Sequence, residues 1–239
     1  MLNGKVALVT GSSKRIGKAI ALALAKNGAD VAVHYNKSKK EAESVKKEIE
    51  KLGKCSITVK ADLTNPKEVE QMFKDVIQKF RKIDILINNV GNFIFKNIDE
   101  YSAEEWDYLL DTTLNTTFYC CKFALPYMRK QKFGRIINIA DSLADRIQAS
   151  PKLTPYIIGK TGVLILTQTL AVTEAKYNIN VNAVSPGVME NSVVKPEDEI
   201  PKGRYGTYED ITNPMLFLLD KKSDYITGAN IKVNGGWRL

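Results

Sequence analysis

Short apolar runs alternate with longer helical stretches along the whole chain, and this alternation constrains the fold more than any other feature. Continuous apolar runs such as 6–9 and 134–139 are typical of strands buried on both faces of a sheet. Strands separated by helices form βαβ units, which predicts a doubly wound parallel sheet with helices on both faces. The expected strands are 6–9, 31–35, 56–60, 84–88, 134–139, 180–184 and 230–233, and the main helices are 17–27, 38–52, one from Asn65-Pro66 onward, 103–130, 156–177 and 208–219.

Composition and length limit what this fold can be. The chain has 239 residues, 44% of them hydrophobic and 26% charged, which is a globular balance and excludes a disordered or collagen-like chain. No linker, repeat or low-complexity stretch divides it, so residues 1–239 are expected to form a single α/β domain. No apolar run approaches the ~18 residues that span a bilayer, and no signal segment precedes the first strand. A cytoplasmic protein without a membrane span is therefore expected.

Cysteine and histidine usage and net charge argue against several other classes of function. Cys120 and Cys121 are adjacent, His34 is the single histidine, and no Cys/His cluster occurs, so no metal site is expected. The net charge of +8 would suit a nucleic acid or a phosphate-bearing ligand. The lysines are interleaved with glutamates on helical faces such as 37–54, and no aromatic-plus-basic RNA motif accompanies them. Nucleic-acid binding is therefore not expected.

The turn after the first expected strand has the composition of a phosphate-binding turn. Gly11 and Gly17 flank this strand-to-helix connection. Gly11 permits a tight turn, and Gly17 permits close backbone approach at the start of the helix. Free N–H groups and the helix dipole at Lys14, Arg15 and Ile16 favour a pyrophosphate. The sheet is therefore expected to be a Rossmann-type, dinucleotide-binding sheet.

The end of the second expected strand indicates which dinucleotide binds. An NAD-dependent protein usually carries Asp or Glu there, bonded to the ribose 2′-hydroxyl. The sequence at this point is Tyr35-Asn36-Lys37-Ser38, which contains no acid. Lys37, with Lys14 and Arg15 of the glycine turn, supplies positive charge that suits a 2′-phosphate. NADPH is therefore the expected cofactor, and Tyr35, Asn36, Lys37 and Ser38 are expected among its contacts.

These features occur together with further motifs in an order typical of one enzyme family. The chain resembles the short-chain dehydrogenase/reductase family over essentially its whole length. The matching motifs are Thr10-Gly11…Gly17, Asp62-Leu63, Asn88-Asn89-Val90-Gly91, Asn115, Tyr156…Lys160, Ser185-Pro186-Gly187 and the ending Tyr225-Ile226-Thr227-Gly228…Val233-Asn234-Gly235-Gly236. The resemblance implies a cofactor site that also includes Asp62, Leu63, Asn89, Val90, Gly91, Pro186, Gly187 and Val188.

Tyr156 and Lys160 are the expected catalytic pair. They are four residues apart at the start of a helix, so their side chains share one face. A lysine cation beside a phenol stabilises the phenolate and lowers the phenol's pKa, so Tyr156 is expected to donate a proton where hydride arrives. By resemblance, Lys160 also holds the nicotinamide-ribose hydroxyls, and Asn115 holds a water in the proton relay.

The third catalytic position departs from the family pattern. The family has a serine after the fifth strand, whereas the aligned residue here is Asp141, and Ser142 is the alternative if the loop shifts. The interval to Tyr156 is also slightly longer than is usual in the family. An ionised carboxylate would repel a developing alkoxide. It could instead bind an amino-pyrimidine ring, or pass protons to a ring nitrogen after hydride adds to a C=N bond.

Two further residues add to a resemblance to the pteridine reductase branch of the family. Arg15 stands at the middle position of the usual glycine trio, and Phe93 follows the Asn89-Val90-Gly91 motif. In that branch the basic residue contacts phosphate and pterin, the aromatic ring stacks on the pterin, and Asp replaces Ser. The resemblance therefore implies NADPH-dependent reduction of a pterin-like heterocycle, with substrate contacts from Arg15, Phe93, Asp141 and Ser142.

Two other functions compete with this hypothesis. One is a 3-oxoacyl-acyl-carrier-protein reductase or another ketone reductase, for which the basic surface would suit an acidic carrier protein. The other is a non-catalytic dinucleotide-sensing protein on the same fold, which the intact Tyr156, Lys160 and Asn115 argue against. The stretch 188–202 is shorter than is usual in the family and lacks an obvious substrate-covering helix, which leaves the substrate open.

Related enzymes usually assemble as tetramers through the helices before and after the fifth strand. Here these helices are 103–130, interrupted or reset near Thr112-Thr113, and 156–177. Both carry apolar residues beyond one sheet-facing stripe, which predicts a homotetramer. The apolar residues expected on this surface are Phe118, Cys120, Cys121, Leu164, Leu166 and Leu170.

Overall fold

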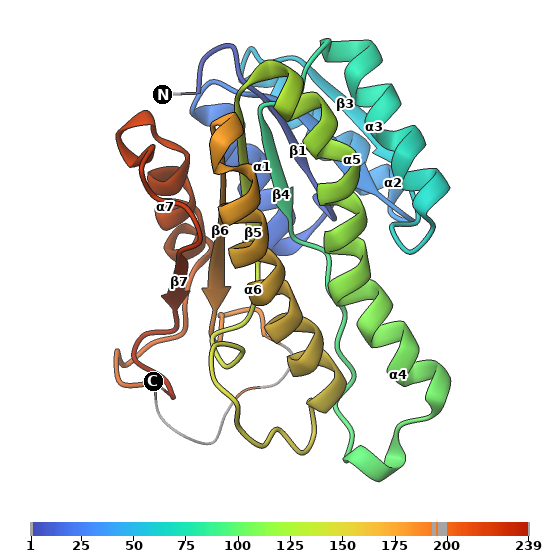
Figure 1. The fold of residues 1–239 in the computed structure, drawn as a ribbon, viewed down its shortest axis with the longest axis vertical. Helices are drawn as coiled ribbons and strands as arrows, with labels where there is room; N and C mark the ends of the chain where they lie inside the picture. Colours follow the sequence, from blue (N-terminus) through green and yellow to red (C-terminus); the bar gives the residue numbers. More distant parts are fainter. Residues whose placement is uncertain (1, 193–194, 196–199, 239) are drawn as a thin grey trace.

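A seven-stranded parallel sheet forms the centre of the structure, a computed structural model that describes residues 2–192, 195 and 200–238 (Figure 1). The strand order is β3-β2-β1-β4-β5-β6-β7, with every neighbouring pair parallel. The doubly wound parallel sheet predicted from the sequence is thus confirmed, and each strand lies close to its expected position. The strands are β1 (Val6–Val9), β2 (Asp30–Tyr35), β3 (Ser56–Lys60), β4 (Ile85–Asn88), β5 (Gly134–Ile139), β6 (Ile179–Pro186) and β7 (Asn230–Val233).

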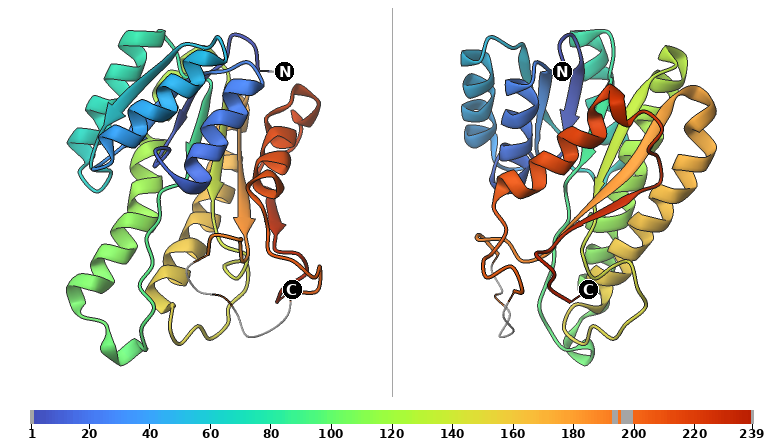
Figure 2. Two further views of the ribbon diagram at one scale, coloured as in Figure 1. Left: turned by 180° about the vertical axis from the view of Figure 1, so that it is seen from behind. Right: turned by 90° about the vertical axis from the view of Figure 1, so that its left-hand side faces the viewer.

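Helices cover both faces of the sheet, as Figure 2 shows from two sides. One face packs against α1 (Arg15–Lys26), α2 (Lys39–Lys51) and α7 (Tyr208–Leu219). The other packs against α3 (Pro66–Phe80), α5 (Thr116–Gln131) and α6 (Thr154–Glu174). Side chains of a strand alternate between the two faces. In β1, Ala7 and Val9 accordingly join the first core and Leu8 joins the second.

The helix expected at 103–130 is divided where the sequence predicted an interruption. It consists of α4 (Ala103–Leu110), a π-helical segment η2 (Asp111–Asn115) and α5. Ser102 begins α4 by accepting a hydrogen bond from the Glu105 N–H at 3.2 Å. In the π-helical segment the backbone forms one turn that is wider than an α-helical turn, on the side that faces α6. Such segments often occur at functional sites. Short 3-10 turns complete the helices, at η1 (Ile98–Glu100), η3 (Ala175–Tyr177) and η4 (Lys221–Ser223).

Cys120 and Cys121 lie in the core rather than on the outer face of α5. Both are at most 1% exposed and pack in the core between the sheet, α3 and α5. The expectation that they form part of an assembly surface is therefore wrong. A periodic pattern locates a helix, but small apolar residues fit its buried side as well as its outer side.

The strand order reverses between β1 and β4, and this reversal positions the candidate site. The chain leaves β1 toward β2 on one side, and β4 and β5 follow on the other. Loops at the carboxyl ends of such neighbouring strands separate and leave a crevice, which is where open α/β sheets bind ligands. The glycine turn after β1 and the Asn89-Val90-Gly91 segment after β4 both begin at this crevice.

Candidate active site

The glycine turn is held against the loop after β4 by direct hydrogen bonds. Asn89 donates from its backbone N–H to Thr10 Oγ1 at 2.8 Å and from Nδ2 to the Thr10 carbonyl at 3.0 Å. Gly11 has a φ of +61°, a conformation that favours glycine. A Cβ on Gly17 would overlap the Gly11 carbonyl and lie 2.7 Å from Asn89 Nδ2. The predicted roles of Gly11 in the turn and Gly17 in close approach therefore match the structure.

His34, at the end of β2, is a structural part of this turn that the sequence analysis did not assign. Its Nδ1 accepts the Gly11 N–H at 2.9 Å, so its Nε2 donates to the Ala61 carbonyl at 3.1 Å. Burial lowers the pKa of His34 from 6.5 to about 4, which keeps the ring neutral and able to accept. The Ser12 N–H also points inward, to the His34 carbonyl at 3.0 Å.

Because these two N–H groups are bonded inside the protein, an anion must bind further along the turn. The first N–H groups of a helix have no partner within the helix, and α1 begins at Arg15. The backbone N–H groups of Arg15, Ile16 and Gly17 are therefore the donors available to a pyrophosphate. The phosphate contacts expected for Arg15, Ile16 and Gly17 stay a prediction.

The basic residues expected around the 2′-phosphate point in different directions. Lys14 Nζ lies 2.8 Å from Glu41 of α2, with both side chains about half exposed. Arg15 has a φ of +51° and donates to the Asn191 carbonyl at 2.7 Å, beyond β6. Lys37 lies at the end of β2, where its charge helps to lower the pKa of Asp62. Lys37 therefore remains by the expected ribose position, whereas Arg15 extends to the loop after β6.

The ends of β2 and β3 adjoin each other and hold Asp62 as a carboxylate. The Asp62 Oδ1 accepts from the Thr64 hydroxyl at 2.7 Å and from the Thr64 N–H at 3.0 Å. These bonds and a hydrogen bond from Asn36 lower the pKa of Asp62. Leu63 beside it is 4% exposed. Tyr35 and Ser38 complete the expected contacts on this side, with Tyr35 buried at the end of β2 and Ser38 preceding α2.

Tyr156 and Lys160 lie on consecutive turns of α6, as the sequence predicted. The Tyr156 hydroxyl donates to Asp141 Oδ2 at 3.3 Å, and Lys160 Nζ donates to the Ile139 carbonyl at 2.6 Å. A Cβ on Gly91 would lie 3.1 Å from Lys160 Nζ, so the loop after β4 closes directly over the lysine. The catalytic pair and the proposed cofactor loops thus meet at the mouth of the crevice.

Burial decides the protonation of all three ionisable groups at this point. It raises the pKa of Tyr156 well above its usual value, and the neighbouring Asp141 raises it further. It also raises the pKa of Asp141, although Lys160 opposes the shift, and it lowers the pKa of Lys160 to about 8. The prediction that Lys160 lowers the pKa of Tyr156 is therefore wrong for this structure. Desolvation and a hydrogen bond to an acidic group outweigh the lysine.

Asp141, rather than Ser142, faces the catalytic tyrosine. The Asp141 carboxyl is held by the Leu143 N–H, which donates to Oδ1 at 2.9 Å, and its Oδ2 is the atom bonded to Tyr156. Ser142 is 1% exposed and points toward Gly187, and its hydroxyl has no partner among the described residues. The substrate-side position left open between the two residues is therefore filled by Asp141.

The remaining predicted residues surround this centre. Phe93 is 41% exposed, and its ring meets that of Tyr156 edge-on, with centroids 6.0 Å apart. Pro186 ends β6, and Gly187 and Val188 follow it, with the Gly187 N–H bonded to the Val233 carbonyl at 2.9 Å. Asn115 is turned away to Asp111, to which its Nδ2 donates at 2.6 Å. The stretch 188–202 lies partly outside the described residues, so its predicted shortness stays a prediction.

Comparisons with known proteins agree with this geometry. A family model described as enoyl-(acyl carrier protein) reductase matches residues 11–238. A short-chain type dehydrogenase/reductase from Mycobacterium marinum superimposes with a TM-score of 0.92 at 33% identity, over 99% of this chain and 96% of that one. The chain belongs to the short-chain dehydrogenase/reductase family. The family resemblance inferred from the motifs is thus confirmed.

Two curated relatives and one further solved structure cover nearly all of this short-chain dehydrogenase/reductase. The 3-oxoacyl-acyl-carrier-protein reductase FabG of Staphylococcus epidermidis is 39% identical, over 97% of this chain and 98% of that protein. A 3-oxoacyl-acyl-carrier-protein reductase of Synechocystis is 40% identical, over 98% and 97% respectively. Acetoin dehydrogenase YohF from Salmonella typhimurium has a TM-score of 0.89 at 30% identity, over 98% and 95%.

The residues of the turn after β1 and of the loop after β4 suit a dinucleotide. Glycine at position 17 leaves the backbone open where a side chain would fill the turn, and the first-turn N–H groups of α1 face the same opening. Gly91 similarly leaves room beside the Lys160 ammonium. Phosphates at α1 and ribose hydroxyls at Lys160 would therefore both find donors.

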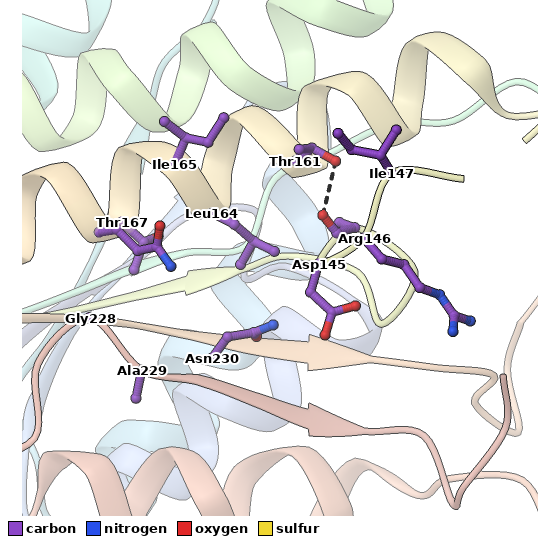
Figure 3. Close-up of a pocket in the computed structure, with 12 residues that line it drawn as sticks. Asp145, Arg146, Ile147, Thr161, Leu164, Ile165, Thr167, Gly228, Ala229 and Asn230 are labelled. Carbon is purple, nitrogen blue, oxygen red and sulfur yellow. Dashed lines mark hydrogen bonds between the residues drawn. The ribbon is translucent and has the colours of Figure 1, made fainter. Parts of the chain in front are cut away.

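A separate cavity of about 210 Å³ lies between the loop after β5, α6 and the start of β7 (Figure 3). In the figure Asp145 and Arg146 come from that loop, Leu164 and Ile165 from α6, and Asn230 from β7. Other residues than the catalytic pair line it, so it is distinct from the candidate active site. The full lining is Ala144, Asp145, Arg146, Ile147, Thr161, Leu164, Ile165, Thr167, Gln168, Gly228, Ala229 and Asn230.

Proposed function

We propose that this short-chain dehydrogenase/reductase is an NADPH-dependent reductase whose first candidate substrate class is the 3-oxoacyl thioesters. The observation that carries the proposal is the placement of Tyr156 and Lys160 beside the cofactor crevice. The substrate class rests on relatives near 40% identity, named as 3-oxoacyl-acyl-carrier-protein reductases, which match the chain over nearly its whole length. They favour the ketone-reductase alternative over the pterin-like substrate first expected from the sequence.

When bound by the turn after β1 and by Lys160, NADPH would supply a hydride to the carbonyl carbon of the substrate. Tyr156, a phenol that is protonated at neutral pH, then donates its proton to the carbonyl oxygen. Lys160 holds the ribose hydroxyls beside Tyr156, as the family resemblance implies. Burial raises the pKa of Asp141, which favours its protonated form. In that form the carboxylic acid donates a hydrogen bond to the same oxygen instead of repelling it. The carboxylic acid thereby replaces the hydroxyl of the family's serine.

The preference for NADPH over NADH rests on charge at the end of β2. Lys37 is the nearest cation, and the position lacks the acid that would bind a ribose 2′-hydroxyl. Lys14 is paired with Glu41 at the surface, and such exposed pairs contribute at most about 1 kcal/mol, so a phosphate can replace the glutamate. NADPH is expected to bind at least about tenfold more tightly than NADH.

A second candidate substrate is a pterin-like heterocycle reduced at a C=N bond. Asp141 favours it, because an acidic group beside Tyr156 can bind an amino-pyrimidine ring or protonate a ring nitrogen. Phe93, exposed and edge-on to Tyr156, is placed to stack on a flat ring.

NADPH oxidation on a substrate panel tests the proposal. The panel contains an acetoacetyl thioester, the same acyl group on an acyl carrier protein, a dihydropterin and a simple ketone. The thioesters are expected to be turned over, and the Tyr156→Phe variant is expected to lose this activity while still binding NADPH. Turnover of the dihydropterin alone would overturn the first candidate in favour of the second. No turnover of any substrate would overturn both.

We also infer that the protein assembles through α5 and α6, as a homotetramer by family resemblance. Three apolar residues seven positions apart leave the outer face of α6 uncovered: Ile158 is 46% exposed, Ile165 60% and Val172 81%. Phe118 of α5 adds a fourth exposed apolar side chain. A contiguous apolar stripe of this kind on a monomer is typical of a protein interface, and a second copy can present the same stripe.

A further inference from the structure

Two phenylalanine side chains lie on the outer side of the segment that follows β4. Phe93 is 41% exposed and Phe95 is 45% exposed, whereas Ile94 and Lys96 are less exposed than either. Residues 91–97 contain no turn and run from β4 to η1 (Figure 1), so side chains two residues apart point to the same side. Neighbouring exposed apolar side chains at the mouth of a site are typical of a ligand-binding groove.

The two rings lie between the catalytic tyrosine and a lysine. The Phe93 ring meets that of Tyr156 edge-on, with centroids 6.0 Å apart. An extended chain advances about 3.3 Å per residue, so Phe95 lies about 7 Å further along the segment. The Nζ atom of Lys152 lies 5.4 Å from the centroid of the Phe95 ring, within the range of a cation–π contact. The catalytic tyrosine and the cation therefore lie at opposite ends of this pair of rings.

Hydrogen bonds hold the segment against the loop that precedes α6. The Lys96 N–H donates to the Lys152 carbonyl at 3.2 Å. The Tyr101 hydroxyl lies 3.1 Å from the same carbonyl and 2.5 Å from the carbonyl of Ile94. Both rings and the lysine are therefore attached to backbone that is already positioned, so little ordering is needed when a ligand binds.

The charge of Lys152 is not neutralised by an ion pair within the described residues. Two other lysines at this end of the sheet differ in this respect, because Lys96 pairs with Glu105 at 2.6 Å and Lys232 pairs with Asp145 at 2.8 Å. An ammonium without a carboxylate partner attracts an oxyanion, and the resulting hydrogen bond is charge-assisted. Lys152 is exposed, so an oxyanion can reach it from solvent.

We propose that Phe93, Phe95 and Lys152 form a substrate subsite that selects for an oxyanion on the part of the substrate away from the reacting carbon. The proposal rests on the proposed reductase function and names a feature of its substrate. The apolar or flat part of the substrate lies along the two rings, and the oxyanion binds the Lys152 ammonium. A phosphate on the carrier arm of a thioester and a carboxylate on the tail of a pterin share this chemistry.

The position of Lys152 explains why the sequence did not assign it. The residue lies in the interval between Asp141 and Tyr156, which is slightly longer than is usual in the family. Spacing along the chain does not relate this interval to Phe95, because the contact forms only where the loops after β4 and β5 lie side by side. The subsite is therefore a feature of this chain, and the family resemblance did not imply it.

Two pairs of substrates test the subsite, since within each pair the reacting group is the same and one member carries the oxyanion. One pair is acetoacetyl-coenzyme A and neutral acetoacetyl-N-acetylcysteamine, and the other is dihydrofolate and neutral dihydrobiopterin. In the pair that the enzyme reduces, Lys152→Gln is expected to lower the ratio of kcat/KM for the anionic member to that for the neutral member about fivefold, as for the loss of one exposed ion pair. Lys152→Arg should keep this ratio within about twofold of the wild-type value. Lys96→Gln, whose ammonium is held by Glu105, is the matched control and should also keep it.

An unchanged ratio in Lys152→Gln, for the pair that is reduced, would overturn the proposal. A second measurement needs no turnover: calorimetric titration of the NADP⁺-loaded protein with coenzyme A and with p-aminobenzoylglutamate. Lys152→Gln should raise the Kd of at least one of these probes about fivefold, and the probe that responds identifies the source of the oxyanion. Equal Kd values in both proteins, or no binding of either probe to the wild-type protein, would overturn the subsite even in an active reductase. A shift in Kd without turnover of any substrate would instead overturn the reductase function alone.

Discussion

At the scale of single residues, the buried histidine is the part of the site with the clearest pH signature. Burial depresses the pKa of His34, so the folded protein binds its proton less readily than the unfolded chain. The stabilisation is then fully present above the unfolded pKa of 6.5 and is lost as the pH falls toward about 4. Over this window the loss is on the order of 3 kcal/mol in the free energy of unfolding.

Urea unfolding at several pH values checks this expectation. The wild-type protein should lose stability as the pH falls from 7 to 4, and His34→Leu should remove most of this slope. The variant should also be less stable at pH 7 and bind NADPH more weakly, because the Gly11 N–H and the Ala61 carbonyl lose their partner. His34 is the only histidine, so an equal slope in both proteins would contradict the assignment.

The effect of substituting Asp141 is expected to differ between the two candidate substrates. If protonated Asp141 donates to the carbonyl oxygen in ketone reduction, the rate should fall as the pH rises through its raised pKa. Asp141→Ser should remove this limb and leave ketone reduction equal or faster, because a hydroxyl donates at every pH. In pterin reduction the same change should cost about 10–100-fold in kcat/KM. The parallel pH–rate profiles of both enzymes on both substrates are the measurement, and full pterin activity in Asp141→Ser would contradict the heterocycle hypothesis.

The sequence alone predicted contacts between residues that are close along the chain. It missed contacts between residues that only the fold brings together. Tyr156 and Lys160 share a helix face at any helix geometry, so their proximity was predictable. His34 contacts Gly11 only because β2 lies beside β1, which spacing along the chain does not reveal. The direction of the Tyr156 pKa depends on burial, which was also not predictable from a pair of residue types.

At the scale of elements, the strand-to-helix turn after β1 is the connection on which cofactor binding depends. Gly17→Ala would place a Cβ against the Gly11 carbonyl and Asn89 Nδ2. We expect the turn to open and the Kd for NADPH to rise more than about tenfold, measured by fluorescence titration. Gly53→Ala is the control: its φ of +74° adds backbone strain that Gly17 lacks, but nothing lies within 4 Å of the new Cβ. Unchanged NADPH affinity in Gly17→Ala would contradict this role of the turn.

At the same scale, the positions of helices and strands were predictable from the periodicity of apolar residues. Where each helix or strand ends depends instead on tertiary contacts. The apolar runs of the strands predicted their order along the chain and their burial. The break near Thr112-Thr113 was expected, but its π-helical form reflects packing of η2 against α6. Similarly, α1 begins at Arg15 rather than at Gly17, although Arg15 itself has a positive φ at the turn.

At the scale of the whole molecule, α6 is the element whose surface is least accounted for by packing within a single chain. Within the described residues, Thr154–Tyr177 is long and apolar enough to cross a membrane by length and composition, with a mean hydropathy of 1.3. The same helix carries buried Lys160 and packs on β6. Its inner apolar face is thus accounted for by the sheet, and its outer face is the interface between copies proposed above.

Charge on that outer face should therefore disrupt assembly without unfolding the chain. Ile165→Glu and Val172→Glu place carboxylates on exposed positions of α6, so each protomer should keep its melting temperature within a few degrees. In an assembly with a two-fold axis, however, the carboxylates of two copies would lie beside each other and lose their hydration. The free-energy cost of this desolvation would exceed the stabilisation that the interface provides. Light scattering at micromolar concentration should report an oligomer for the wild-type protein and a smaller species for the variants. Ile147→Glu, fully exposed and on the loop after β5, is the control that should leave the assembly intact. A monomeric wild-type protein would show that the apolar stripe serves another partner, because four large exposed apolar side chains along two adjacent helices are not needed for the fold itself.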